Sequence, residues 1–552
     1  MLSDPEDQKI RVEHASSNEC HGDHKTPDAA VGAKASLEAV QRRRLLPPSI
    51  IASMSPEQRA DAEKRLVRKV DWRLLPMVVL MYIMNYIDRN NIAAAKLAHI
   101  ERDLNMPEDS TQFQLILQLK TTVSILFVGY LLMQIPSNLL LNKIGKPALY
   151  LPTCMIIWGV ISTVTAEAKN FGGLLAIRFF LGFVEAAYFP GCLYYLSCWY
   201  TRQELGLRTA FLYSGALISG AFSGLISAGI TGNMDGARGL SAWRWLFIIE
   251  GAATIFIAFL AFPLLPNFPR TTSWLTEEEK ALAVWRLEED IGEDDWVDSE
   301  QQTFWQGAKQ AFADVKTYVL LVLLFGIVAS GSVTNFFPTV VSTLGYNNVV
   351  SLLLTAPPYV LTVIASMINA WHADRTGERF WHVVLPLVVN MAANIIAATT
   401  TSLGPRYLSM MLMVPSVYSA FVVALAWISN TLPRPPAKRA AALAFINAVS
   451  NSSSIYASYS KHPHSLSLIA TTLVGRKLTG FHRPVYPKSA APGYIIAMSV
   501  NCATSFMAII AAVVLRFILV RLNRKLEQGI FVEGAINALP GEAAHHGFRF
   551  RV

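Results

Sequence analysis

The feature that most constrains this chain is a series of apolar stretches, each long enough for a helix to cross a lipid bilayer. An α-helix needs about 20 apolar residues to cross the hydrocarbon core, and such stretches recur between short polar segments. Because backbone polar groups find no water inside a bilayer, these stretches are expected to be helical. We therefore predict an all-α polytopic membrane protein with about twelve transmembrane helices in two six-helix halves. The predicted spans lie near 74–96, 118–141, 149–167, 171–196, 207–231 and 243–264 and, after a polar stretch, near 317–344, 351–372, 381–400, 407–430, 439–459 and 493–520.

The composition excludes a soluble protein. Charged residues make up 16% of the chain and hydrophobic residues 53%, whereas soluble proteins are about 25% charged. The net charge of +8 comes from short basic clusters between apolar stretches rather than from a nucleic-acid-binding surface. These clusters fall on alternate connections, so the positive-inside rule predicts that both termini are cytoplasmic. The sequence contains no metal cluster, nucleophile–base pair or cofactor loop, so we expect no enzyme activity, and no cofactor apart from a proton as coupling ion.

The polar segments divide the chain into two helical halves, a linker and two tails. In the linker, Thr276 followed by Glu279 is typical of a capping box at the start of a helix. The predicted domains are a disordered cytoplasmic tail at 1–70, a six-helix bundle at 71–266, a cytoplasmic linker with an amphipathic helix at 267–316, a second six-helix bundle at 317–520 with an anomalous insert at 460–485, and a cytoplasmic tail at 521–552.

Four charged residues within the predicted spans of the first half are the main functional candidates: Asp88, Arg89, Arg178 and Glu185. A charge inside a bilayer costs about 3 kcal/mol on insertion scales, so such residues indicate function. The helical rise predicts that Arg89 and Arg178 lie at one depth. Arginine suits a carboxylate because its planar guanidinium donates to both oxygens at once.

The balance of these four charges predicts what the site would carry. The two arginines and two acids sum to zero, so one bound monoanion is balanced by one proton on Asp88 or Glu185. The sequence therefore predicts symport of an anion with a proton. The alternative is that these residues form structural ion pairs between helices.

Polar residues also recur on one face of the predicted eleventh span. Asn447, Ser450, Asn451 and Ser454 follow the i, i+3, i+4, i+7 spacing of a helix face. Such a face is expected to avoid lipid. Two interpretations stay open: contact with substrate and hydrogen bonding between helices.

A short polar-basic turn recurs once in each half. It follows the second span as Asn142–Lys146 and the eighth span as Asp374–Arg379. A repeat at corresponding positions indicates two homologous six-helix halves. The candidate gating residues are Asn142, Gly145, Asp374, Arg375 and Gly377.

These turns resemble the loop signature of the major facilitator superfamily, although Asn142 stands where the first half usually has Asp. Further motifs are Asn85–Arg89, Gly129–Tyr130, Ile135–Asn138, Arg178–Glu185, Ser197–Tyr200 and Trp243–Gly251. Together they resemble the anion:cation symporter family of this superfamily, in particular its fungal branch of allantoate-permease-like carriers. The resemblance implies the major facilitator fold, an arginine of the first span that binds the substrate carboxylate, and acids of the first and fourth spans that couple protons. It also implies that Tyr86 and Tyr130 approach the substrate.

Residues 460–485 have no counterpart in that family. They are basic on the side predicted to be extracellular and have no periodic pattern. A retained intron or gene-model error and a real extracellular loop both stay open.

The function predicted from all of these features is secondary active transport. We expect proton-coupled symport of a small organic anion, a carboxylate such as allantoate, nicotinate or another vitamin-like acid, by alternating access. The expected partners are this anion and the lipid bilayer, with no nucleic acid, and the expected state is a monomer. The expected location is the plasma membrane, with the vacuolar membrane as alternative. Two other functions stay open: a transporter of another small solute and a non-transporting nutrient receptor.

Overall fold

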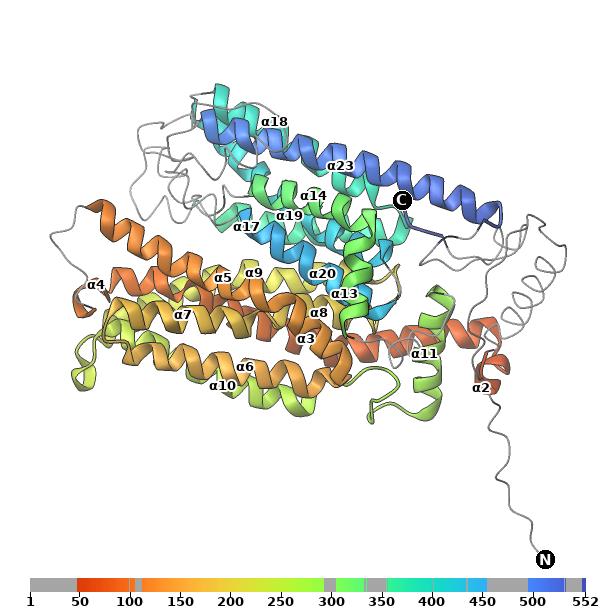
Figure 1. Ribbon diagram of the computed structural model, residues 1–552, viewed down its shortest axis with the longest axis horizontal. Coiled ribbons are helices and arrows are strands. Elements are labelled where there is room, and N and C mark those ends of the chain that lie inside the picture. Colours follow the sequence, from red (N-terminus) through yellow and green to blue (C-terminus); the bar gives the residue numbers. More distant parts are fainter. Residues whose placement is uncertain are drawn as a thin grey trace, which may run out of the picture. The chain divides into compact units, whose positions relative to one another are not determined.

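The computed structural model shows an all-helical chain (Figure 1). The structure describes residues 47–98, 100–104, 112–291, 304–331, 334, 354, 356–400, 402–432, 435–453, 495–530, 532 and 549–552. The predicted insert at 460–485 lies outside these residues. No strand occurs among the residues described, which confirms the predicted fold class.

Each predicted span overlaps a described helix. The first half consists of α3 (Pro56–Leu97), α5 (Gln112–Ile144), α6 (Pro147–Val164), α7 (Phe171–Glu185) continued by α8 (Tyr188–Ser197), α9 (Leu205–Asn233) and α10 (Ala242–Leu264). The second half consists of α14 (Val315–Ser330), α17 (Ala356–Thr376), α18 (Phe380–Thr399), α19 (Leu403–Thr431), α20 (Pro436–Asn451) and α23 (Ile495–Glu527). Short helices α2 (Ser49–Ala52), α4 (Ile100–Asp103), α11 (Glu277–Ile291) and α13 (Phe304–Ala313) complete the described set.

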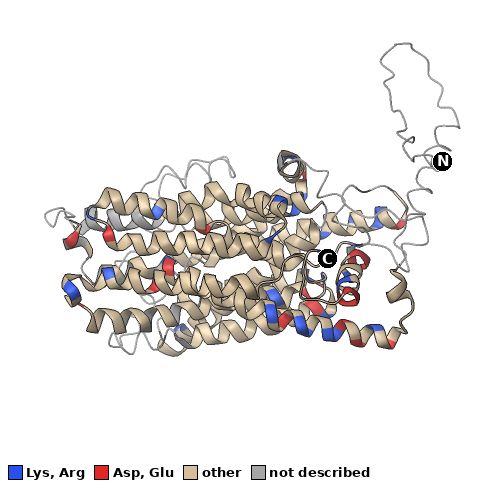
Figure 2. Cartoon of the chain, turned by 90° about the horizontal axis from the view of Figure 1, so that it is seen from below, with Lys and Arg blue, Asp and Glu red and all other residues tan. Residues whose placement is uncertain are grey.

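The composition of these helices suits a membrane. Within the described residues, eight helices are long and apolar enough to span one, and a ninth is counted if α13 and α14, bent by 76°, form one span. Figure 2 shows most charged residues near the ends of the long helices and few along their middles. The chain is therefore built to place its apolar helix surfaces in lipid and its charges in water.

Two glycines set the packing of α5 against α7. A Cβ atom added to Gly182 would overlap the carbonyl oxygen of Leu126, and one added to Gly129 would overlap that of Phe179. The two backbones touch where neither residue has a side chain, as is common between membrane helices. This contact holds the C-terminal end of α7, which carries Glu185, close to the side chains of α5.

The first helix begins earlier than predicted. Residues 56–70 are helical, not part of a disordered tail, and the start of α3 contacts the linker helix α11. Lys69 Nζ lies 2.7 Å from a carboxylate oxygen of Glu279, and Arg59 pairs with Glu289. These ion pairs join α3 to α11 in a region outside the apolar stretch, where hydropathy alone does not predict a helix.

The predicted capping box at the start of α11 is confirmed. The amide of Glu279 donates to Thr276 Oγ1 at 3.2 Å, and the amide of Thr276 donates to Glu279 Oε2 at 3.0 Å. The reciprocal bonds satisfy two amides that the helix start would leave open.

The two halves meet along α5 with α20 and α9 with α17. In the first of these contacts, Asn138 Nδ2 donates to the carbonyl oxygen of Ala440 at 3.1 Å. The functional candidates of the sequence lie on these helices and on their neighbours α3 and α7.

Candidate substrate site

The centre of the candidate site is an ion pair between α3 and α7. Arg89 donates from Nη2 and Nε to one oxygen of Glu185, at 3.0 and 3.2 Å. The other oxygen, Oε1, has no hydrogen-bond partner in the described structure. The Arg89 side chain is 14% exposed and that of Glu185 is fully buried. Arg89 is therefore the member of the pair that a solute can reach.

Two tyrosines flank the Arg89 guanidinium. Its Cζ lies 4.8 Å from the ring centroid of Tyr130 and 5.2 Å from that of Tyr86. The ring faces favour the cation and hold its orientation. The structure thus brings together four of the residues predicted from the sequence: Tyr86, Arg89, Tyr130 and Glu185.

Asp88 lies in a different environment from its neighbour Arg89. Successive residues point about 100° apart around a helix, and Asp88 faces α6 and α10. It accepts hydrogen bonds from Ser162 Oγ at 2.8 Å and from Thr254 Oγ1 at 2.7 Å. Asp88 is fully buried, and its described hydrogen bonds go to α6 and α10 rather than to the Arg89–Glu185 pair.

Arg178 is buried on the side of the bundle that faces α10. It is 1% exposed, and its Cζ lies 5.5 Å from the ring centroid of Phe247. Its Nε and Nη2 atoms have no hydrogen-bond partner among the described residues. It interacts electrostatically with Glu185, Asp88 and Glu250. In this conformation Arg178 therefore balances buried acids and does not share the exposure of Arg89.

Glu250 on α10 is the acid that the sequence analysis did not select. It is 2% exposed, and neither carboxylate oxygen has a hydrogen-bond partner in the part of the chain described. The signal was available, because Glu250 lies inside the predicted span 243–264. With Glu250 included, the buried groups are two arginines and three acids, so their charges sum to −1 when all are ionised.

The polar stripe of the second half makes contact with the first half. Asn447 Nδ2 donates to Gln134 Oε1 on α5 at 3.3 Å, and Asn451 Nδ2 donates to the carbonyl oxygen of Asn447 at 2.9 Å. Gln134 lies one helical turn beyond Tyr130. The described bond of Asn447 is thus one between helices, and it lies one turn from the residues around Arg89.

An aromatic series connects the same region to the second half, and nothing in the sequence distinguished it from ordinary packing. Ring centroids lie 5.1 Å apart for Tyr86 and Tyr82, 6.4 Å for Tyr82 and Tyr213, and 5.3 Å for Tyr213 and Tyr418. Tyr418 belongs to α19 of the second half. A movement between the halves would therefore change the surroundings of Tyr86, which lies over Arg89.

The two gating turns share a backbone conformation but differ in their bonds. Gly145 and Gly377 both have positive φ, 66° and 71°, which favours glycine and supports the repeat. Asn142 accepts a hydrogen bond from Tyr194, within its own half. Asp374 instead accepts from the amides of Gly206 and Leu207, at 3.2 and 2.7 Å, across the two halves.

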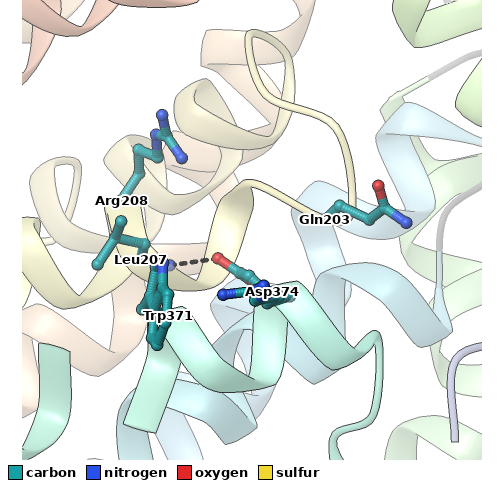
Figure 3. Close-up of a pocket in the computed structure, with 6 residues that line it drawn as sticks. Gln203, Leu207, Arg208, Trp371 and Asp374 are labelled. Carbon is teal, nitrogen blue, oxygen red and sulfur yellow. Dashed lines mark hydrogen bonds between the residues drawn. The ribbon is translucent and has the colours of Figure 1, made fainter. Parts of the chain in front are cut away.

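Figure 3 shows Asp374 of α17 reaching the start of α9 beside a pocket of about 460 Å³. Asp374 also accepts from Arg379 Nη2 at 2.5 Å. No residue of the Arg89 site lines this pocket, which belongs to the junction of the halves. Its lining residues are Gln203, Leu207, Arg208, Trp371, Asp374 and Arg375.

Asp374→Ala is expected to lower the melting temperature of the purified protein by at least about 5 °C, because two amides and the buried Arg379 lose their acceptor. The measurement is thermal unfolding, in which the folded protein remaining after heating is quantified by size-exclusion chromatography. Asp61→Ala is the control, since Asp61 is 72% exposed and 4.0 Å from its nearest partner, Lys64. Equal melting temperatures for the two variants would contradict a stabilising role of the Asp374 contacts.

Comparison with known proteins identifies the family. Residues 78–458 match the family model described as Major Facilitator Superfamily. The chain is 33% identical over 382 residues to "MFS transporter prlL" from Fungal sp. (strain NRRL 50135), covering 68% of this chain and 74% of that protein. It is 32% identical over 344 residues to "Putative tartrate transporter" from Agrobacterium vitis, covering 62% of this chain and 72% of that protein.

A solved structure shares the fold. The MFS proton:xylose symporter XylE bound to 6-bromo-6-deoxy-D-glucose superposes with a TM-score of 0.62 at 15% identity, covering 82% of this chain and 96% of that one. The relatives and the fold are those of multi-pass membrane transporters and not of enzymes. The chain belongs to the Major Facilitator Superfamily.

Proposed function

We propose that this transporter carries a small organic anion across the membrane together with a proton. The observation that carries the proposal is the ion pair of Arg89 and Glu185, in which the arginine is the reachable member. The relative named as a putative tartrate transporter supports a carboxylate as the substrate class. The proposed branch within the family is that of the anion:cation symporters, with allantoate-permease-like carriers as the model.

The proposed coupling is a competition for Arg89. A substrate carboxylate that binds the guanidinium takes the donors that Glu185 now uses. Glu185 is then a buried carboxylate without a hydrogen-bond donor among the described residues, a state that costs several kcal/mol unless it takes up a proton. One negative charge and one proton therefore enter the site together. Release of the substrate returns Arg89 to Glu185 and drives the proton off.

A second set of buried charged residues, Asp88, Arg178 and Glu250, balances charge in this scheme. Asp88, Arg178 and Glu250 sum to −1 when all are ionised, and a proton on either acid makes the group neutral. Because Asp88 already accepts two hydroxyl hydrogen bonds, its environment suits a carboxylate better than that of Glu250, which has no described donor. We assign to Arg178 a role in holding these acids, with substrate contact only after a rearrangement.

The remaining candidates take their places around this centre. Tyr86 and Tyr130 orient Arg89, and Asn447 with Asn451 would meet the substrate from the second half. The gating turns at Asn142–Lys146 and Asp374–Arg379 close the end that we place on the cytoplasmic side, with both termini, by the distribution of Lys and Arg. We propose a monomer in the plasma membrane, with the vacuolar membrane as alternative.

The test is uptake of radiolabelled mono- and dicarboxylates into proteoliposomes under an imposed pH gradient. Symport predicts that an acidic exterior stimulates uptake and that the substrate gradient and the proton gradient drive each other. Uptake of a neutral solute that ignores the pH gradient would favour a carrier of another small solute. Absence of flux with every acid, together with retained binding, would favour a receptor.

Glu185→Gln is expected to separate binding from coupling. Glutamine cannot release a proton, so acid-stimulated accumulation should fall at least about tenfold while substrate exchange across the membrane stays within about threefold. The measurement compares uptake under a pH gradient with counterflow at equal pH. Glu167→Gln, at an exposed position of the same half, is the matched control. Full acid stimulation in the Glu185 variant would exclude this residue as the coupling acid.

A further inference from the structure

Residues 549–552 lie against the second half at the end where the gating turns meet. The Phe550 side chain is 2% exposed, and Lys316 Nζ lies 4.8 Å from its ring centroid. The amide of Phe550 donates to Asn523 Oδ1, and Asn523 Nδ2 donates back to the carbonyl oxygen of Phe550, both at 2.9 Å. A segment outside any helix is thus bound by its backbone and anchored by one buried aromatic side chain, as in peptide recognition.

The same segment braces the gating turn of the second half. The backbone amide of Arg379 donates to the Val552 oxygen at 2.9 Å, and Trp427 Nε1 donates to the carbonyl oxygen of Arg551 at 3.0 Å. Arg379 in turn donates from Nη2 to Asp374 and to the carbonyl oxygen of Arg202. Arg379, which bonds across the halves to the carbonyl oxygen of Arg202, is therefore itself bonded to Val552.

One bond of the segment reaches the first half directly. Arg202 Nη1 donates to the carbonyl oxygen of Arg549 at 2.9 Å, and Arg202 also pairs with Asp290 of the linker helix α11 at 3.2 Å. Arg202 lies between α8 and α9, so segment, linker and both halves meet at this residue. Alternating access requires the halves to separate at this end, which would break the Arg202 bond.

From these contacts we propose that the second half carries a docking surface for residues 549–552, and that docking holds this end of the transporter closed. The surface consists of Lys316, Arg379, Trp427 and Asn523, and the first-half residue Arg202 adds a bond to the docked segment. The inference rests on the fold and the movement of its halves, and not on the identity of the substrate. It makes residues 549–552 a regulator of which side of the membrane the site faces.

Docking of residues 549–552 is opposed by the charge of Arg551, which favours its release. Burial, together with the nearby Arg202, lowers the pKa of Arg551 to about 10. A lowered pKa of a basic group means that its charged form is less stable in this position, so the charge of Arg551 opposes docking at neutral pH. The segment is held by backbone bonds and Phe550 against this cost.

The test is hydrogen–deuterium exchange of the full-length protein in nanodiscs, followed by mass spectrometry. Deletion of residues 549–552, or Phe550→Ala, is expected to accelerate exchange about tenfold in residues 202–210 and 371–379, because burial of the phenyl ring no longer stabilises the closed end. Residues 202–210 are decisive, since the amides of Gly206 and Leu207 bond to Asp374 of the other half. Arg549→Ala is the matched control: its side chain pairs with Glu527 at the surface, about half exposed, and its backbone acceptor is unchanged.

Three outcomes would overturn the proposal. Unchanged exchange after deletion would show that the segment holds nothing closed. Faster exchange in residues 371–379 alone would show that the segment merely covers the turn it touches. Equal acceleration of exchange in α6 and α10, which contribute no residue to the docking surface, would show that the segment is required for folding in general and does not specifically close this end.

Discussion

Arg89→Ala is expected to reduce carboxylate uptake by at least about a hundredfold, the loss that follows when a charged, bidentate contact worth about 3 kcal/mol is removed. The variant loses the cation of the ion pair, which is its partly exposed member, and leaves Glu185 buried with no described hydrogen-bond donor. Arg89→Lys is expected to recover little, because an ammonium cannot donate to two carboxylate oxygens in one plane. The measurement is the initial rate of uptake, normalised to the amount of protein in the membrane.

Arg65→Ala on the same helix is the control for this loss. Arg65 is exposed, near the start of α3 and outside the predicted span, and its removal should leave uptake within about twofold. Acid-stimulated uptake by the Arg89→Ala variant with an unchanged KM would contradict the assignment of Arg89 to the substrate. Loss of the protein from the membrane would instead indicate the structural ion pair that the sequence left open.

Gly182→Val is expected to remove folded protein altogether. Its first side-chain atom would overlap the backbone of Leu126, which no side-chain rotation relieves, and overpacking of this kind costs about 3 kcal/mol or more. Separation of α5 from α7 would also move Glu185 away from Arg89. The measurement is the yield of monodisperse protein in fluorescence-detected size-exclusion chromatography.

Gly229→Ala is the matched control for the glycine variant. A Cβ atom added there meets no atom within 4 Å, although Gly229 also lies in a membrane helix. Its yield should equal that of the unaltered protein. A normal yield for Gly182→Val would mean that α5 and α7 are free to separate, and that the close approach is not needed for folding.

The sequence predicted the helices well because their cause is local. Apolar length alone decides where a helix can cross a bilayer, so α6, α10 and α18 begin and end near the predicted bounds. It failed at the start of α3, because residues 56–70 lie outside the apolar stretch: a capping box of Ser55 and Gln58 begins the helix, and ion pairs join it to a linker helix more than 200 positions away. No local pattern announces a partner at that distance.

The candidate site divides in the same way. Intramembrane charges are visible in the sequence, and the rule that found Arg89 and Glu185 also applies to Glu250. What sequence could not show is which charge pairs with which: Arg89 pairs with Glu185, whereas Arg178 is buried towards α10. The bonds of Gln134 and Asp374 depend on how two halves meet, a property of tertiary packing.

The position of residues 549–552 bears on how this protein is handled in the laboratory. A fluorescent reporter or affinity tag joined directly after Val552 would have to fit beside Arg379, whose amide bonds to that residue. Such a fusion would disturb the docked segment in the very preparation meant to report on it. A tag placed away from residues 549–552, or a cleavable one removed before measurement, leaves that contact intact, so the choice of tagging site becomes an experimental variable for this transporter.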